Sequence, residues 1–150
     1  MAKRKATYKM YVTRRENIAV GDQPDHTLML TELEGEPIDM KIGVAGEFIS
    51  RRSVGFHDRI KGSGKMEGYA ISTFQHGQVY SRFEGQRDGT TKITSGTWKV
   101  KQGTGKLTGL TGQGIDGPNR NRIIAMRRTS AHQGENQQAP DPTFHTHFQF

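Results

Sequence analysis

The chain of 150 residues contains no cysteine, one tryptophan and no long apolar run. The absence of cysteine excludes disulfide bonds, zinc–thiolate sites and thiol nucleophiles, so a metal would have to be held by histidine and carboxylate groups. No stretch approaches the roughly 18 to 20 apolar residues of a membrane-spanning helix, and no apolar segment follows the basic N-terminus. These absences predict a soluble, cytoplasmic protein with no membrane partner.

Apolar residues are scarce, at 31% of the chain, whereas 19 residues are glycine. A chain of this length supports one domain with one core. Isolated Val, Ile, Phe and Tyr residues between glycine-rich turns are typical of short strands rather than of disorder. The composition therefore predicts a single all-β domain.

Basic residues outnumber acidic ones, 22 to 15, which gives a net charge of +7. They occur in small separated groups: residues 3–5, 14–15, 51–52, 99–101 and 127–128. Because no single arm or helix face gathers them, the distribution disfavours nucleic-acid binding. An anionic ligand or simple solubility remains open as the reason for the charge.

Period-two alternation of apolar residues predicts about eight strands, since helical periodicity is weak throughout. The predicted strands are residues 7–13, 27–34, 43–54, 66–74, 79–85, 91–101, 106–112 and 121–129. We therefore predict one barrel domain over residues 1–129, with a flexible basic segment at residues 1–5. A linker rich in Gln, Asn, Gly and Pro follows at residues 130–143, and a C-terminal strand or tail at 144–150.

A glycine-rich heptapeptide occurs twice, at residues 62–68 and 103–109, each time before a strand-like run. The repeat predicts the same hairpin geometry at two places in one sheet. His76-Gly77, Asp88-Gly89 and Gln102-Gly103 are typical of two-residue hairpin loops, because glycine tolerates a positive φ. Such loops determine which residues lie opposite one another on neighbouring strands.

These loops place large aromatic and very small residues on one strand face. The predicted face consists of Met66, Gly68, Ala70, Ser72, Phe74, Val79, Ser81, Phe83, Thr94, Gly96, Trp98, Val100, Leu107 and Gly109. A closed sheet of about eight strands has an interior just wide enough for side chains, so a layer of small residues leaves room for a small ligand. We predict ligand contacts from Phe74, Phe83, Trp98, Ser72 and Ser81. In the alternative, large side chains from residues 27–54 fill the space.

Several segments carry a resemblance to a known family: residues 26–32, both heptapeptides, Gly96-Thr97-Trp98, and residues 103–114. Together they resemble the allene oxide cyclase-like barrels, a group related in form to dirigent proteins and lipocalins. The resemblance covers residues 26–115. It implies a calycin-like closed antiparallel barrel with an apolar cavity, assembled as a homo-oligomer, a dimer or a trimer. Some members of the group cyclise or isomerise an apolar substrate.

Glu32 matches the position of a cavity glutamate in plant cyclases of this shape. It follows Leu28 and Leu30 with period two, so the three residues share a strand face. On an enclosed apolar face Glu32 would be a candidate acid, base or cation stabiliser, and Leu30 would contact the ligand. In the alternative register Glu32 lies in solvent.

Asp58 is the second candidate catalytic residue. Adjacent strand residues point to opposite faces, so His57 and Asp58 cannot both face one cavity. Asp58 shares parity with Met66 along a continuous strand, which favours Asp58. In the alternative, the His57-Asp58-Arg59 segment is a solvated loop at the barrel mouth.

The Gly-Lys pairs of the heptapeptides do not form a phosphate-binding loop. Such a loop needs a glycine where this chain has Arg59 and Val100. His145 and His147 share a strand face in the C-terminal sequence, but two ligands are too few for a metal site. We predict neither a metal nor a cofactor.

Tyr69, Tyr80, Arg82 and Glu84 fall on the outer face in the predicted register. Tyrosine and arginine are enriched at interface hot spots, so the cluster is a candidate subunit interface. A cross-strand surface network is the alternative.

The predicted function is binding of a small apolar or polyketide-like molecule inside a barrel, with cofactor-free cyclase or isomerase activity left open. Enclosure would fix the conformation of a flexible substrate while Glu32 steers charge or protons. One alternative is a carrier or sensor without turnover. Another is an oligomeric structural or nucleic-acid-associated protein with a filled barrel.

Overall fold

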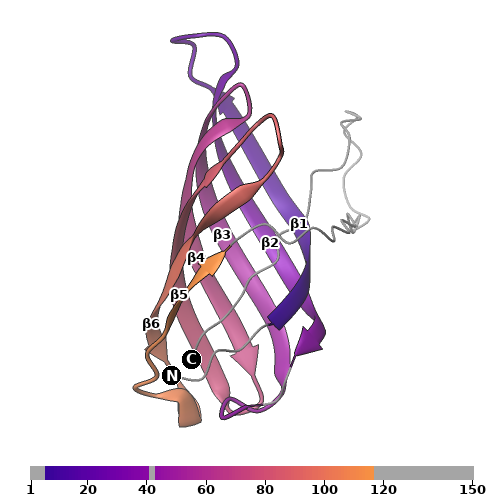
Figure 1. Ribbon diagram of the computed structural model, residues 1–150, viewed down its shortest axis with the longest axis vertical. Helices are drawn as coiled ribbons and strands as arrows, with labels where there is room; N and C mark the ends of the chain where they lie inside the picture. The colour runs from indigo at the N-terminus through magenta and orange to yellow at the C-terminus, as the bar shows by residue number, and fades with distance from the viewer. Residues whose placement is uncertain (1–5, 41–42, 117–150) are drawn as a thin grey trace.

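The computed structural model describes residues 6–40 and 43–116. This part of the chain forms one antiparallel sheet of seven strands in sequence order (Figure 1). The elements are β1 (Ala6–Ala19), β2 (His26–Met40), β3 (Phe48–Ile60), β4 (Ser63–Phe74), β5 (Gly77–Arg87), β6 (Thr94–Gly103), the 3-10 turn η1 (Gly105–Leu107) and β7 (Gln113–Asp116). The prediction of an all-β fold is confirmed. In these ranges no helix has the length and apolar character to cross a membrane.

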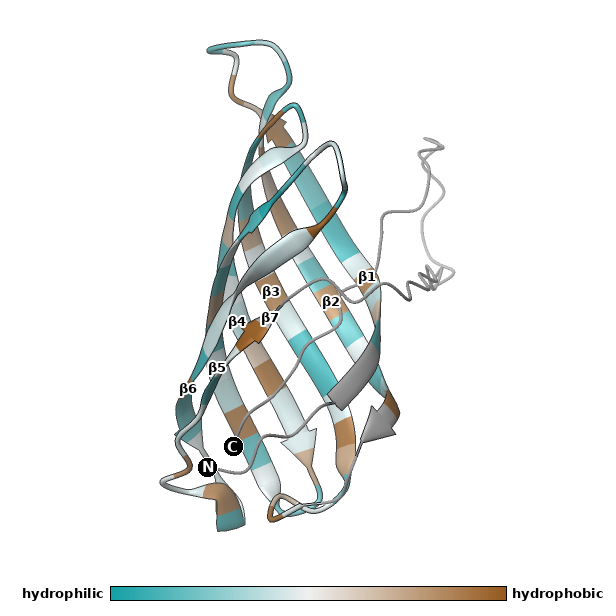
Figure 2. Ribbon diagram, viewed as in Figure 1, coloured by the Kyte–Doolittle hydropathy of each residue, from teal (hydrophilic) through white to brown (hydrophobic). Residues whose placement is uncertain are grey.

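The sheet has two unlike faces, because alternate residues of each strand point to opposite sides. Along β5, Val79, Ser81 and Phe83 are buried, whereas Arg82 and Glu84, of the opposite parity, are exposed. Figure 2 shows the resulting alternation of apolar and polar residues along the strands. The sheet also curls strongly, as Figure 1 shows. We call the buried side the enclosed face and the other side the outer face.

Side chains from distant strands converge on the enclosed face. The core cluster combines Met10 of β1 with Trp98 and Val100 of β6, although β2 to β5 separate these strands in the sheet. The other buried members of this cluster are Ala45, Phe48, Ala70, Phe74, Val79, Phe83 and Leu107. Curling thus gives a single sheet one core.

The observed β4–β5 register differs from the predicted one by two residues, and the β5–β6 register differs by four from Ser81 onward, beyond a bulge between Tyr80 and Ser81. β4 pairs Phe74 with Gly77, so the loop is Gln75-His76 and every partner is two residues from the predicted one. β6 pairs Trp98 with Phe83, where Val79 was expected. Because side-chain direction repeats every second residue, an even shift leaves each side chain on the predicted face.

The loop between β5 and β6 is longer than two residues because Asp88 organises it. The Asp88 carboxylate accepts hydrogen bonds from the backbone N–H groups of Thr90 (2.8 Å) and Thr91 (3.0 Å). The backbone N–H of Asp88 donates to the carbonyl of Ile93 at 2.9 Å. The connection therefore spans residues 88–93. A two-residue loop at Asp88-Gly89 would have left residues 91–93 in the next strand.

The prediction of a strand over residues 106–112 is wrong. Thr104 donates its backbone N–H to Gln78 (2.9 Å), and Lys106 donates to His76 (2.9 Å). The second heptapeptide therefore satisfies its backbone against the β4–β5 turn instead of pairing with β6, and Gly109 is exposed. β7 pairs with β6 farther along the chain, with Gly114 opposite Trp98.

β1 and β7 form the two edges of the described sheet. No strand pairing joins these edges within residues 6–40 and 43–116. The predicted strand at residues 121–129, the linker at 130–143 and the tail with His145 and His147 lie outside the described residues.

Candidate functional site

The aromatic part of the enclosed face is a packed core. The rings of Phe48 and Phe74 meet edge to face with their centroids 5.4 Å apart. Trp98 and Val79 are among the most deeply buried side chains, and Leu107 of η1 belongs to the same core. Phe74 and Trp98, both expected to contact a ligand, therefore contribute first to the packing of this core.

Some of the small residues accommodate the protein's own rings. A Cβ atom on Gly68 would lie 2.6 Å from Cζ of Phe83, and one on Gly55 would lie 3.3 Å from it. A Cβ atom on Gly114 would likewise lie 2.5 Å from the Trp98 ring. An aromatic ring passes close to the backbone at Gly68 and Gly114, so a side chain there would force a shift, whereas the contact at Gly55 is only tight. Phe83, another expected ligand contact, thus occupies part of the predicted space.

The serines of the enclosed face differ in their hydrogen bonding. Ser81 donates to the carbonyl of Ala70 at 3.5 Å. Ser72 is 1% exposed, and its Oγ has no hydrogen-bond partner among the described residues. A buried hydroxyl without a partner costs about 1–3 kcal/mol. Among the residues predicted to contact a ligand, Ser72 therefore has a hydroxyl group that could still form a hydrogen bond.

His57, rather than Asp58, faces the enclosed side. The β3–β4 ladder pairs His57 with Met66, and His57 is 3% exposed whereas Asp58 is exposed. The expectation for Asp58 assumed a continuous strand as far as Met66. The chain instead reverses at Lys61-Gly62, where both residues have a positive φ, and residues opposite each other across the turn share a face.

The His57 ring is fixed by hydrogen bonds at both nitrogens. Its Nε2 lies 2.8 Å from Oγ1 of Thr31, which is also buried. Arg59 donates from Nη2 to Nδ1 at 3.1 Å. A guanidinium only donates, so Nδ1 accepts and Nε2 carries the proton toward Thr31. In this tautomer His57 is not a base for the Thr31 hydroxyl, and the pair is not a nucleophile–base pair.

Other polar groups lie beside this network on the enclosed face. Arg51, Ser53 and Arg87 are buried, and Arg51 donates from Nε to the Ser53 hydroxyl at 3.4 Å. Sequence reasoning missed these residues because their type is typical of a solvated face. Only their even spacing from buried neighbours in β3 and β5 could have indicated them.

Glu32 and Leu30 lie on the outer face, so the expectation that they face the interior is wrong. Leu30 is 43% exposed, and Arg52 donates from Nε to Oε1 of Glu32 at 2.6 Å. The odd-numbered residues of β2 face the enclosed side instead, since Met29 and Thr31 are buried. Both the even-numbered and the odd-numbered residues of this strand include apolar side chains, so the sequence pattern alone did not show which face is buried.

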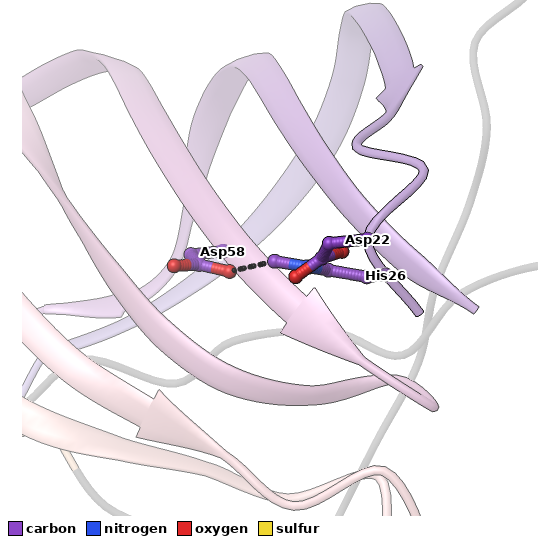
Figure 3. A network of polar contacts seen from close by, with 3 residues as sticks. All are labelled: Asp22, His26 and Asp58. Carbon is purple, nitrogen blue, oxygen red and sulfur yellow. Dashed lines mark hydrogen bonds and ion pairs between the residues drawn. The ribbon is translucent and has the colours of Figure 1, made fainter. Parts of the chain in front are cut away.

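Asp58 belongs to an outer-face network with His26 and Asp22. Nε2 of His26 lies 2.8 Å from Oδ1 of Asp58, and Nδ1 lies 2.5 Å from Oδ1 of Asp22. Figure 3 shows the ring between the two carboxylates. The hydrogen bonds from Asp58 and then Asp22 raise the pKa of His26, and the His26 bond lowers the pKa of Asp22. Through these hydrogen bonds His26 connects Asp22 of the β1–β2 loop to Asp58 of β3. The β2–β3 register brings His26 and Asp58 together.

A groove of about 560 Å³ lies along the outer face of β5, β6 and β7. Its charged lining residues are Arg82, Glu84, Lys99 and Lys101. Arg82 lies directly opposite Lys99 in the β5–β6 ladder. Like charges at opposite positions repel, and the Glu67 carboxylate, which accepts a hydrogen bond from Arg82 at 2.7 Å, offsets the Arg82 charge.

The described residues contain no group of three or more His, Cys, Asp or Glu side chains that could hold a metal ion. Comparisons with protein-family models, with curated proteins and with solved structures found no match for this chain. The chemistry of the two faces of the sheet is therefore what indicates a function.

Proposed function

We propose that the curled sheet closes into an antiparallel barrel and binds a small, mostly apolar molecule on its enclosed face. The strong curl of the described sheet supports the closure (Figure 1). The apolar core cluster of this face supports an apolar ligand body. The cytoplasmic location and the cyclase-like family stay predictions.

The observation that carries the proposal is the buried hydroxyl of Ser72, which has no hydrogen-bond partner among the described residues. A ligand with a carbonyl or hydroxyl group beside it would offset a cost of about 1–3 kcal/mol. The Thr31–His57 pair offers a second polar contact on the same face. The ligand that fits this face is therefore apolar over most of its surface, with one or two hydrogen-bonding groups.

Binding without turnover is favoured over catalysis. Both carboxylates that sequence analysis assigned to chemistry, Glu32 and Asp58, lie on the outer face and bind Arg52 and His26 there. A carrier or sensor needs no proton transfer, whereas a cyclase or isomerase would have to work without these two groups. The enclosed face therefore supports the binding role.

The test uses the neutral apolar dye Nile red, titrated into the full chain. We expect saturable binding, with quenching of Trp98, the one tryptophan of the chain. Loss of the hydroxyl in Ser72→Ala should weaken binding by about tenfold, the worth of one hydrogen bond. Ser50→Ala, at an exposed serine of β3, is the matched control and should bind as the wild type does. Absence of dye binding, or equal affinity for both variants, would contradict the proposal.

The outer groove supports a second candidate function, the binding of an anionic small molecule. Its lining carries three basic side chains, Arg82, Lys99 and Lys101, and one acid, Glu84, and Arg82 is also paired with Glu67 at 2.7 Å. Such binding would weaken steeply between low and moderate salt, whereas dye binding on the enclosed face would barely change. Isothermal titration with inorganic pyrophosphate at two salt concentrations separates the two candidates, and Lys99→Gln should abolish only the anion signal.

A further inference from the structure

Four apolar side chains form a continuous patch on the outer face of the central strands. Leu30 is 43%, Phe56 42% and Tyr69 62% exposed, and Val54 is half-buried. Leu30 lies directly opposite Phe56, and Val54 lies directly opposite Tyr69. Phe56 and Val54 are next-but-one neighbours on β3 and so share its outer face. We call these four residues the outer apolar patch.

The patch is flanked by bound charges. Arg52 pairs with Glu32 at 2.6 Å, and Arg82 pairs with Glu67 at 2.7 Å. An apolar centre with a charged rim is the usual composition of a protein–protein contact. Because the chain carries a net charge of +7, two copies repel each other except where acids offset the bases. The rim of this patch is such a place.

The ladder arranges the patch and its rim in two parallel rows. One row runs across β3, β4 and β5 through Phe56, Glu67 and Glu84. The next row runs across the same strands through Val54, Tyr69 and Arg82. The first row therefore carries the acids and the second carries the base, at matching positions on the same strands.

We infer that a second copy of this chain covers the outer apolar patch, related by a two-fold axis that runs along the surface between these two rows. Such an axis places each row over the other row of the second copy. Phe56 then meets the partner's Val54, and Glu84 meets the partner's Arg82. The contact is made twice, once in each direction, as a two-fold interface requires. This inference does not depend on the ligand proposal.

Light scattering of the full chain tests the apolar half of the contact. We expect a mass of twice 16.8 kDa for the wild type and of 16.8 kDa for Phe56→Glu and Tyr69→Glu. Val44→Glu is the matched control, since Val44 is exposed in the β2–β3 loop, and it should keep the wild-type mass. Circular dichroism checks that each variant keeps its sheet. A monomeric wild type, or patch variants that remain dimeric, would overturn the inference.

A charge reversal tests the two-fold relation itself. Arg82→Glu sets this residue against the partner's Glu84 and should shift the chain to the monomer. Adding Glu84→Arg restores opposite charges across the axis, and the arginine introduced by that substitution would also lie opposite Glu67 within the chain. The double variant should therefore return toward the dimer. If both variants have the same mass, residues 82 and 84 do not face each other across this axis.

Discussion

The Phe83 ring passes so close to Gly68 that a Cβ atom there would lie 2.6 Å from Cζ of the ring and 2.1 Å from the carbonyl oxygen of Val54. A buried ring and a backbone carbonyl thus both require glycine at this position. The enclosed face owes part of its shape to this contact, since the ring lies where a layer of small residues suggested empty space.

Gly68→Ala should destabilise the fold by about 1–3 kcal/mol, because the new methyl group overlaps backbone atoms that cannot move independently. Urea denaturation measures the loss. Gly35→Ala is the matched control: its Cβ would lie 2.5 Å from Sδ of Met10, the far end of a flexible side chain. A smaller loss is expected there. Equal losses in the two variants would mean that the backbone contact at Gly68 relaxes.

The His26 network should make stability depend on pH. The pKa of His26 is raised above its ordinary value of 6.5, so its stabilising contribution is complete below 6.5 and is lost as pH rises through the folded-state pKa. The stability difference between wild type and His26→Gln should thus be larger at about pH 6 than at about pH 9. The contribution of Asp22 to stability has the opposite pH dependence. Because the pKa of Asp22 is lowered, that contribution is lost as the solution becomes acidic.

Denaturation of both proteins across this pH range supplies the measurement. Asp58→Asn removes the first partner of His26 and should reduce the same pH dependence, because Asp58 contributes most to the shift. If the stability difference between wild type and His26→Gln does not change with pH, the pKa of His26 is not raised by folding.

The buried Thr31–His57 contact should behave as a coupled pair. Thr31→Val leaves the Nε2–H of His57 without its acceptor, at a cost of about 1–3 kcal/mol. His57→Phe alone leaves the Thr31 hydroxyl to the weaker contact with Gly55. The double variant should cost less than the two single losses together, by about 0.5–3 kcal/mol. Additive losses in a double-mutant cycle would exclude the hydrogen bond.

Part of the candidate site was predictable from local pattern. Ser72, Phe74 and Trp98 were expected on one face and lie there, although the loops on both sides of β5 differ from those assumed. The register errors at β4–β5 and, beyond the bulge at Tyr80/Ser81, at β5–β6 were even, and an even shift leaves a side chain on its own side of the sheet. Errors of this kind change which residues meet without exchanging inside for outside.

The position of Glu32 could not be predicted in the same way. β2 carries apolar residues on both parities, so its own pattern was compatible with either orientation. Pairing decided the matter: Thr31 lies opposite Gly55 on the enclosed side, and Glu32 lies opposite Val54 on the outer side. The Asp58 error had a related cause, because a turn at Lys61-Gly62 reverses the chain between Asp58 and Met66.

The sequence by itself determined the all-β character of this protein and the shared face of its aromatic residues, because alternation within a strand is a local property of the backbone. Tertiary structure alone decided the registers, the 3-10 turn η1 that carries Leu107 where a strand was expected, and the inward direction of His57. These features depend on hydrogen bonds between segments far apart in the chain. The bond from Lys106 to His76 is one of them, and no local pattern specifies it.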